Sequence, residues 1–344
     1  MTIDLATRVM PADAAAAAAA ARALAEGGLV AFPTETVYGL GADARNGRAV
    51  ARLFAAKGRP RFNPLISHVA DVGAARRLAR FDAAAERLAT AFWPGPLTLV
   101  LPKSIDCPVS ELATAGLDTI AVRVPDHPIA REILMAFAGP VVAPSANRSG
   151  HVSPTSAAHV LADLQGRIDV VIDGGPTQVG IESTIVACLG GAPLLLRPGG
   201  LSREHIESVL GTELAEPSRT TDAPLAPGML GSHYAPRTRL RLEARAVEPG
   251  EALLAFGPVA APGAEHARAV LNLSPSGDLV EAAANLFSHL RALDAAGVAR
   301  IAVVPIPQEG IGEAINDRLA RAAAPRDQET GVGNQIDLDP TPDA

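Results

Sequence analysis

Apolar and polar positions alternate in blocks along the first two thirds of the chain. Asp13 precedes an alanine-rich stretch that ends at Gly27-Gly28, and this pattern predicts a capped helix. The apolar run Leu29–Phe32 then predicts a short buried strand. Further helices are expected over 48–56, 74–79, 83–92, 128–137, 155–164 and 202–210, and strands over 65–69, 97–101, 119–124, 140–143, 170–172, 183–187 and 194–196. The mixture predicts an α/β domain, and the close spacing of three of these strands indicates that part of its sheet is antiparallel.

A second alternating unit follows after a change in composition. It predicts strands over 252–256 and 301–305, a helix that ends at Gly297, and a helix over 314–324, in the order of a small doubly wound α/β domain. The polar, proline-rich stretch 216–224 reads as a linker, but Met229, His233 and Tyr234 cluster just after it. We therefore divide the chain into a first domain (10–210), a linker (211–239), a second domain (240–325) and a polar, acidic tail (326–344) that we expect to be disordered.

Composition narrows the function classes. Of 344 residues, 48% are apolar and 19% are charged, which excludes wholesale disorder. A net charge of −7 and an aromatic content of 3% count against a basic nucleic-acid surface and against stacking platforms for single strands. Cys107 and Cys188 lack zinc-type spacing. The N-terminal residues lack the pattern of a signal peptide, and no stretch is long and apolar enough to span a bilayer, so we expect a cytoplasmic protein.

The candidate chemistry lies in polar, turn-rich segments at strand ends. The chain has no P-loop, no nucleophile elbow and no HExxH motif. Instead, Pro33–Leu40 places Thr34, Glu35, Thr36 and Tyr38 directly after a strand, where ligands of open α/β sheets bind. An ordinary polar loop explains this segment equally well. The segment Lys57–Pro64 packs three cations into five residues, more than a helix C-terminus needs, and suits a polyphosphate or carboxylate.

Arg123 lies inside an apolar strand and therefore needs an anionic partner. A protein carboxylate such as Asp126 and a bound ligand are both possible at this point. His68 also lies on a predicted strand, where a histidine is more often a satisfied core residue than a ligand. The segments Pro144–Gly150, Gly180–Thr184 and Leu196–Gly200 add further polar groups at strand ends. Together the segments describe a cradle for a nucleoside triphosphate and a small polar co-substrate, with catalysis by positioning and charge stabilisation.

These segments, together with Pro94–Thr98, resemble in sequence and order the YrdC-like family over about residues 10–210. The stretches Ser232–Pro236 and Gly312–Leu319 are similar to the long, two-domain form of that family. The resemblance implies a twisted mixed sheet with a concave face, followed by a small doubly wound (Rossmann-like) domain. It also implies a nucleotidyltransferase that converts L-threonine, bicarbonate and ATP to threonylcarbamoyl-adenylate and pyrophosphate. A partner enzyme would then transfer the threonylcarbamoyl group to an adenosine beside the anticodon of tRNA.

The resemblance also assigns roles to residues. Lys57 and Arg59 would be catalytic, and Arg123 would pair with the carboxylate of threonine. The expected ATP-binding residues are Lys57, Arg59, Asn63, Thr119, Ser145, Asn147, Ser153, Arg197 and Tyr234, and the expected threonine-binding residues are Thr36, His68, Arg123 and Ser183. The linker would bring Tyr234 over the nucleotide as a lid. The cofactor Mg²⁺ would be held mainly by ATP, with no metal ligand from the protein.

The expected partners are the substrates, the transferring enzyme and, as a further candidate, tRNA itself, without a membrane. Two alternatives are an RNA-binding module without catalysis and a carbamoyl-adenylate-forming maturation factor for metal centres. The net charge of −7 counts against the first alternative. Related domains of the second kind sit in longer chains with zinc-type cysteine motifs, which this sequence lacks.

Overall fold

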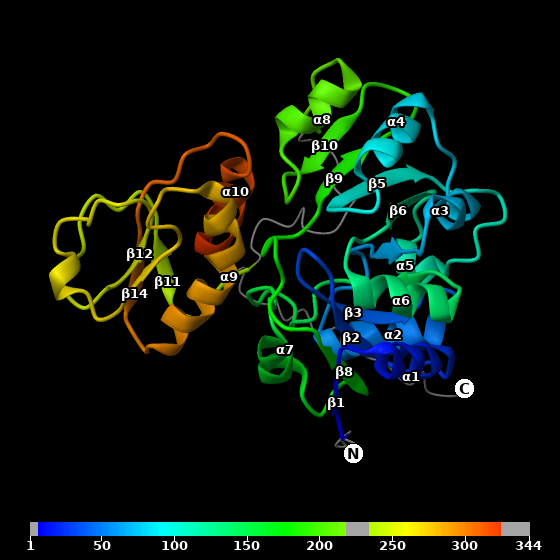
Figure 1. Ribbon diagram of the computed structural model, residues 1–344, viewed down its shortest axis with the longest axis horizontal. Helices are drawn as coiled ribbons and strands as arrows, with labels where there is room; N and C mark the ends of the chain where they lie inside the picture. Colours follow the sequence, from blue (N-terminus) through cyan, green and yellow to red (C-terminus); the bar gives the residue numbers. More distant parts are fainter. Residues whose placement is uncertain (1–5, 218–233, 325–344) are drawn as a thin grey trace, which may run out of the picture.

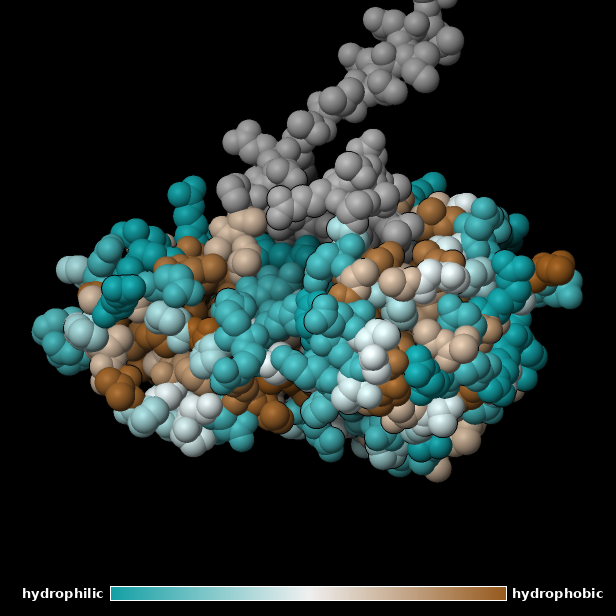
Figure 2. Space-filling model, turned by 90° about the horizontal axis from the view of Figure 1, so that it is seen from above, coloured by the Kyte–Doolittle hydropathy of each residue, from teal (hydrophilic) through white to brown (hydrophobic). Residues whose placement is uncertain are grey.

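The computed structural model describes residues 6–217 and 234–324, which form a large N-terminal part and a smaller C-terminal part (Figure 1). Most of the linker island that contains Met229 and His233 lies outside the described residues, as does the expected tail 326–344. Tyr234 is described. Within these ranges no helix is long and apolar enough to cross a membrane. Figure 2 shows apolar side chains scattered among hydrophilic ones on the drawn face of both parts.

The N-terminal part is built on a ten-stranded mixed sheet. Its strand order is β1-β8-β2-β3-β7-β4-β6-β5-β9-β10. For example, β2 pairs antiparallel with β3, whereas β4 pairs parallel with β6, so the mixed sheet is confirmed. The strands are β1 (Arg8–Pro11), β2 (Val30–Pro33), β3 (Tyr38–Asp43), β4 (Ile66–His68), β5 (Leu97–Pro102), β6 (Thr119–Arg123), β7 (Val141–Val142), β8 (Val170–Asp173), β9 (Thr184–Ala187) and β10 (Leu194–Arg197).

Side-chain caps define most helix starts in this part. Asp13 accepts a hydrogen bond from the backbone N–H of Ala16, and this cap confirms the predicted first helix. Asp71 and Ser156 cap two helices that begin at other residues than the apolar pattern predicted, two residues earlier and two residues later, respectively. The helices are α1 (Ala14–Ala25), α2 (Gly47–Lys57), α3 (Val72–Leu78), α4 (Ala83–Phe92), α5 (Glu111–Thr114), α6 (Pro128–Phe137), α7 (Ala157–Leu164) and α8 (Arg203–Leu210).

The helices leave part of one sheet face open for a site. Helices α2, α4 and α8 contribute to the large core on one face, and α1 and α6 pack on the other face against β2, β7 and β8. On β6, Val122 points into the large core, whereas Ala121 belongs to a small apolar cluster on the opposite face. Arg123 shares the face of Ala121, because side chains two residues apart on a strand point the same way. The site is built on this face.

The C-terminal part is a four-stranded parallel sheet with strand order β11-β14-β12-β13. Leu254 and Ile301 pack with the two long helices, whereas Leu253 and Ala302 face a loop and a short 3-10 helix. The long helices therefore cover one face of this sheet, the face toward the N-terminal part (Figure 1). The elements are β11 (Arg239–Arg241), β12 (Ala252–Ala255), η1 (Ala264–His266), β13 (Val270–Asn272), α9 (Leu279–Ala295), β14 (Arg300–Val303) and α10 (Gly312–Ala323).

The two parts are in close contact through α9 and α10. Val37 and Ile181 of the N-terminal part belong to the same apolar cluster as Phe287 of α9. Gly180 has φ +77°, and a Cβ there would lie 2.4 Å from the Cα of Ala284, so only glycine fits against α9. The C-terminal part therefore forms a wall beside the open sheet face.

Candidate active site

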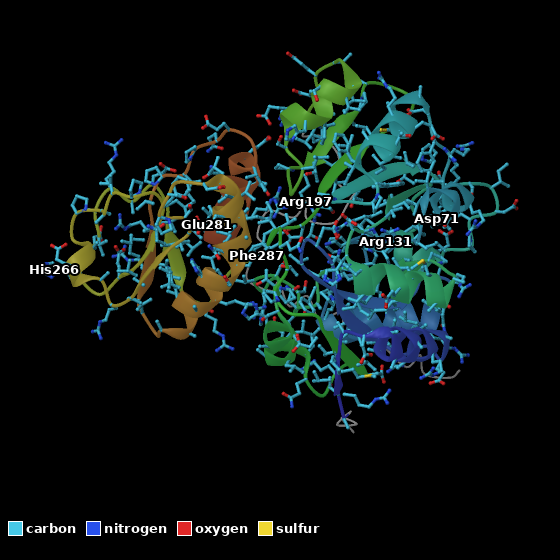
Figure 3. The ribbon with its side chains drawn as sticks, in the orientation of Figure 1. Asp71, Arg131, Arg197, His266, Glu281 and Phe287 are labelled. Carbon is cyan, nitrogen blue, oxygen red and sulfur yellow. The ribbon has the colours of Figure 1, made fainter. Side chains whose placement is uncertain are left out.

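A buried cavity on the open sheet face collects residues from segments that are far apart in the sequence. Arg197 lies at the edge of the N-terminal part that faces α9 and its Phe287 (Figure 3). The cavity brings together all four predicted threonine-binding residues and four of the predicted ATP-binding residues. Its lining is Thr36, Val37, Arg59, Ile66, His68, Arg123, Ala143, Pro144, Ser145, Glu182, Ser183, Arg197 and Tyr234.

Four other predicted residues stand directly behind this lining. The Lys57 ammonium donates hydrogen bonds to the backbone carbonyls of Ser145 and Asn147. The backbone carbonyl of Asn63 accepts a hydrogen bond from Arg59 Nε at 3.4 Å. Ser153, Lys57, Asn63 and Asn147 are all buried. These residues are placed to support the cavity, and direct contact with ATP stays a prediction for them.

Thr119 is the predicted site residue that the structure leaves outside this group. It begins β6 and pairs with Pro102, whereas Arg123 ends the strand at the cavity. Four residues of strand separate the two, roughly 13 Å at about 3.3 Å per residue. Thr119 shares the face of Arg123, because their spacing is even. Its ATP contact stays a prediction.

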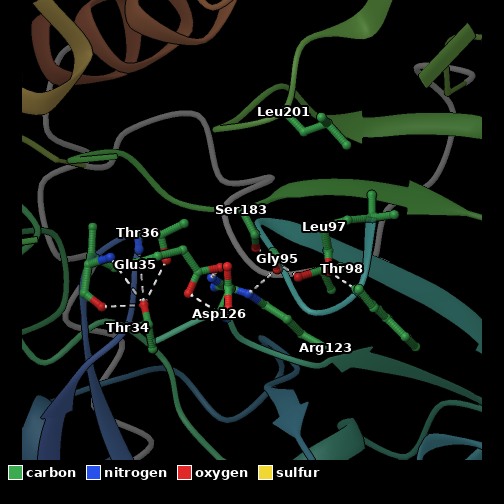
Figure 4. Close-up of polar contacts among 12 residues, drawn as sticks. Thr34, Glu35, Thr36, Gly95, Leu97, Thr98, Arg123, Asp126, Ser183 and Leu201 are labelled. Atoms are coloured by element: carbon green, nitrogen blue, oxygen red, sulfur yellow. Dashed lines mark hydrogen bonds and ion pairs between the residues drawn. The ribbon is translucent and has the colours of Figure 1, made fainter. Parts of the chain in front are cut away.

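The sequence left a protein carboxylate such as Asp126 and a bound ligand open as the partner of Arg123, and the structure pairs Arg123 with a different carboxylate, Glu35. Arg123 Nη2 lies 2.6 Å from Glu35 Oε1, and both side chains are buried. Asp126 contributes through its backbone N–H, which donates to the other Glu35 oxygen at 3.0 Å. Arg123 Nε donates to the carbonyl of Gly95 at 3.2 Å (Figure 4). The guanidinium is therefore held from two sides at the cavity wall.

Paired hydroxyls fix the polar side chains next to Arg123. The hydroxyls of Thr34 and Thr36 lie 2.8 Å apart, and those of Thr98 and Ser183 lie 2.7 Å apart (Figure 4). Each pair orients one cavity hydroxyl, which suits recognition of a small polar ligand. Thr98 was not predicted as a site residue, although it lies in a segment that the sequence singled out.

His68 is a neutral imidazole in this cavity. Burial, helped by the positive charge of Arg123, lowers the pKa of His68 to about 3. Its Nδ1 is buried and has no hydrogen-bond partner among the described residues. Because a buried polar atom is normally paired, this nitrogen is a candidate for contact with a ligand.

The cavity carries a positive charge. Three arginines and one carboxylate, Glu182, line it, so with neutral His68 the lining has a net charge of +2. Burial lowers the pKa of Arg59 to about 10; Tyr234 opposes this shift and Arg197 adds to it. Burial also lowers the pKa of Lys57 well below its ordinary value, and neighbouring Arg59 adds to the shift. An anionic ligand would relieve this crowding of buried positive charge.

The two tyrosines of the chain have different places. Tyr38, which the sequence grouped with the polar segment Pro33–Leu40, begins β3 and donates from its hydroxyl to the carbonyl of Gly175, away from the cavity. Tyr234 lines the cavity, is 1% exposed, and stacks on Phe287 at 5.6 Å between ring centroids. Tyr234 thus joins the cavity to the C-terminal part.

Two known protein families match successive parts of this chain. The family described as "Telomere recombination" (Sua5, YciO and YrdC) matches residues 22–199, and the "Threonylcarbamoyl-AMP synthase, C-terminal domain" family matches residues 201–324. The chain belongs to the Sua5–YciO–YrdC family. This confirms the resemblance to YrdC-like proteins and to their long form.

Members of the Sua5–YciO–YrdC family match along nearly the whole chain. A threonylcarbamoyl-AMP synthase of Pyrococcus abyssi is 45% identical over 89% of this chain and 94% of its own length. A synthase of Bacillus subtilis is 42% identical over 90% and 93%, respectively. The crystal structure of P. abyssi Sua5 complexed with L-threonine has a TM-score of 0.84 at 40% identity and covers 92% of this chain and 98% of that one.

Proposed function

We propose that this protein is a threonylcarbamoyl-AMP synthase, which makes threonylcarbamoyl-AMP and pyrophosphate from L-threonine, bicarbonate and ATP. The observation that carries the proposal is the cavity in which Thr36, His68, Arg123 and Ser183 meet two further arginines. The family relatives along the whole chain support it, since those named above are synthases of this kind.

The reaction joins two anions, and the cavity suits that task. The amine of threonine and bicarbonate give a carbamate and water. A carbamate oxygen then attacks the α-phosphorus of ATP, and the bond to the β-phosphate breaks to release pyrophosphate. Positive charge that is fixed in advance offsets the repulsion between carbamate and triphosphate and stabilises the charge that develops on the leaving group. Arg59 and Arg197 are placed to supply it.

Arg123 is suited to bind the threonine carboxylate. Glu35 and the Gly95 carbonyl hold its guanidinium in one orientation, so little side-chain freedom is lost on binding. The hydroxyls of Thr36 and Ser183 and the neutral ring of His68 offer short-range hydrogen bonds to the remaining polar groups of the amino acid.

Magnesium would arrive with ATP and neutralise part of the triphosphate charge. Among residues 6–217 and 234–324, no group of three or more His, Cys, Asp or Glu side chains could hold a metal ion. The carboxylate in the cavity lining, Glu182, accepts hydrogen bonds from Ser153 and Arg318. We propose that the phosphate oxygens are the main ligands of Mg²⁺, as is usual for this ion with nucleotides, and that Lys57 and Arg59 support the phosphates.

The cavity has to open for the substrates. Its volume is about 50 Å³, far below the roughly 300–1,000 Å³ of pockets that hold ligands of this size. We propose that the wall containing Tyr234 moves to admit ATP and threonine and then closes, which would protect the water-sensitive carbamate. The product would pass in the cytoplasm to a partner enzyme that modifies tRNA.

Pyrophosphate release by purified protein tests the proposal. The assay contains ATP, Mg²⁺ and bicarbonate buffer, with L-threonine or bicarbonate omitted in turn. We expect release only when both are present. Release without either would indicate a nucleotide hydrolase instead. No release, together with salt-dependent binding of RNA at micromolar protein, would favour the non-catalytic RNA-binding module.

A further inference from the structure

A fully buried arginine of the C-terminal part reaches the cavity wall. Arg318 on α10 is 0% exposed, and its Nε lies 2.8 Å from Glu182 Oε2. Its Nη2 donates to the carbonyl of Pro198 at 3.0 Å. The guanidinium carbon lies 5.1 Å from the ring centroid of Tyr234, within range of a cation–π interaction. A buried guanidinium is tolerated only with such partners.

Three partners of Arg318 belong to the cavity or border it, and the fourth, Asp317, precedes it on α10 and lies 2.5 Å from its Nη1. Glu182 and Tyr234 line the cavity, and Pro198 directly follows the lining residue Arg197. The second oxygen of Glu182 accepts a hydrogen bond from Ser153 Oγ at 2.5 Å. One side chain from the second part thus contacts the carboxylate and the aromatic ring, and Ser153 is connected to it through Glu182.

We propose that Arg318 is a positioning residue of the active site, which holds Glu182 and Tyr234 in place so that the C-terminal part completes the catalytic cavity. The inference rests on the proposed synthase activity. It gives the second part a role in the chemistry of the site, in addition to any role in binding a partner.

A second ion pair between the two parts provides a matched comparison. Arg203 of α8 lies 2.6 Å from Glu313 of α10. Unlike Arg318, both side chains are partly exposed to solvent, at 25% and 29%. Neither residue lines the cavity. If Arg318 only fastened the two parts together, loss of either arginine would affect turnover in the same way.

The charge state of Glu182 separates positioning from simple attachment. Burial raises the pKa of Glu182, but Arg318 and then Arg197 more than offset this, so the pKa lies below its ordinary value. The ring of Tyr234 also lies near Glu182, and Asp317 pairs with Arg318 on the other side of the guanidinium. Without Arg318, burial would dominate more and the pKa of Glu182 would rise. A protonated Glu182 would donate a hydrogen bond to Ser153 instead of accepting one, which would reorient that hydroxyl.

The test compares Arg318→Met, Arg318→Lys and the control Arg203→Met in the full-length enzyme. For each we measure kcat, the KM for ATP and threonine, and the ratio of variant to wild-type rate between about pH 6 and pH 8.5. This ratio cancels the change in bicarbonate content. We expect Arg318→Met to lower kcat about tenfold or more, with a loss that deepens toward low pH, and Arg318→Lys to recover part of it. Arg203→Met should stay within about twofold of wild type.

A second variant covers the case in which Arg318→Met does not fold. Glu182→Gln keeps the shape of the side chain and removes its charge. We expect Glu182→Gln to lower kcat, and Arg318→Lys in that background to cost less than it does alone, because the two residues act as a unit. Equal losses in Arg318→Met and Arg203→Met, or additive losses in the double variant, would overturn the inference. Wild-type enzyme that releases no pyrophosphate would contradict the proposed function itself.

Discussion

Two buried arginine–glutamate pairs lie at the same cavity, one within the N-terminal part and one between the two parts of the chain. Arg123 and Glu35 both belong to the N-terminal part, and their pairing distance is 2.6 Å. Arg318 and Glu182 pair at 2.8 Å across the boundary between the two parts. The first pair is fixed by the sheet and its adjoining turns, whereas the second forms only when α10 docks.

This difference suggests that the two walls of the cavity bind different substrates. The wall with Arg123, Thr36 and His68 needs only the N-terminal part, so we expect the threonine site to be preformed. The wall with Tyr234 and Glu182 depends on the C-terminal part, so we expect the nucleotide side of the cavity to be assembled by docking and to open with Tyr234.

Loss of Arg123 should have the largest effect. Arg123→Ala removes the proposed carboxylate ligand and leaves Glu35 buried without its cation, a change that costs roughly 3–5 kcal/mol in comparable pairs. We expect threonine-dependent pyrophosphate release to fall about a hundredfold or more, with loss of threonine binding in calorimetry.

Circular dichroism would show whether the Arg123→Ala protein is folded, and Arg123→Lys keeps the charge if it is not. Arg76→Ala removes an exposed ion pair with Glu86 and serves as the control. Normal rate and threonine affinity in Arg123→Ala would remove Arg123 from the threonine site.

Loss of Arg59 should be next in size and should act on the nucleotide side. Arg59→Ala removes one of three guanidinium groups in the cavity. We expect about a tenfold to hundredfold loss in kcat/KM for ATP, while threonine binding without ATP changes by less than about threefold. An equal loss of threonine binding would show that the two sides of the cavity are not separate.

Substitution of Tyr234 should have a graded, smaller effect. Tyr234→Phe keeps the ring that stacks on Phe287 and faces Arg318, whereas Tyr234→Ala removes both contacts. We expect about a tenfold loss of turnover for alanine and about threefold or less for phenylalanine, since ring contacts contribute roughly 1 kcal/mol each. Identical activity of Tyr234→Ala and wild type would contradict a role of this ring in closing the cavity.

The smallest expected effect is that of pH on threonine affinity. The folded-state pKa of His68, about 3, lies below its ordinary value of 6.5, so the ring stays neutral until the pH falls toward 3. Threonine affinity, measured by calorimetry without ATP or bicarbonate, should therefore be flat between about pH 5.5 and pH 7.5. Affinity that falls through pH 6.5, and does not in His68→Gln, would show that His68 titrates normally.

Local sequence signals predicted much of the fold. The helix at Ala83–Phe92 has the predicted bounds, because Asp82 caps it and an apolar stripe continues to its end. The strands β11 and β13 were missed because each is short and has no fully buried residue, so no apolar run marks either of them. Strand β3 was missed because Tyr38 and its glycines follow a polar turn that resembles a loop.

The sequence predicted the site residues that lie in recognisable motifs, but not the long-range contacts that hold them. The four residues proposed for threonine all line one cavity, although they lie in four separate segments. The partner of Arg123 was not predictable, because Glu35 is 88 residues away and meets it only through sheet pairing. Arg318 lies in the stretch Gly312–Leu319 that carries part of the resemblance, but its contact with the cavity was not predicted, since a cation on an amphipathic helix is usually solvated and only the docking of α10 buries it.

Direct identification of the product is the most decisive measurement. Wild-type protein is incubated with ATP, Mg²⁺, L-threonine and carbon-13 bicarbonate, and the mixture is analysed by mass spectrometry beside the Arg123→Ala variant. We expect a threonylcarbamoyl-AMP that contains the labelled carbon, formed by wild type and not by the variant. AMP or ADP without a labelled adenylate of threonine would contradict the proposed synthase activity.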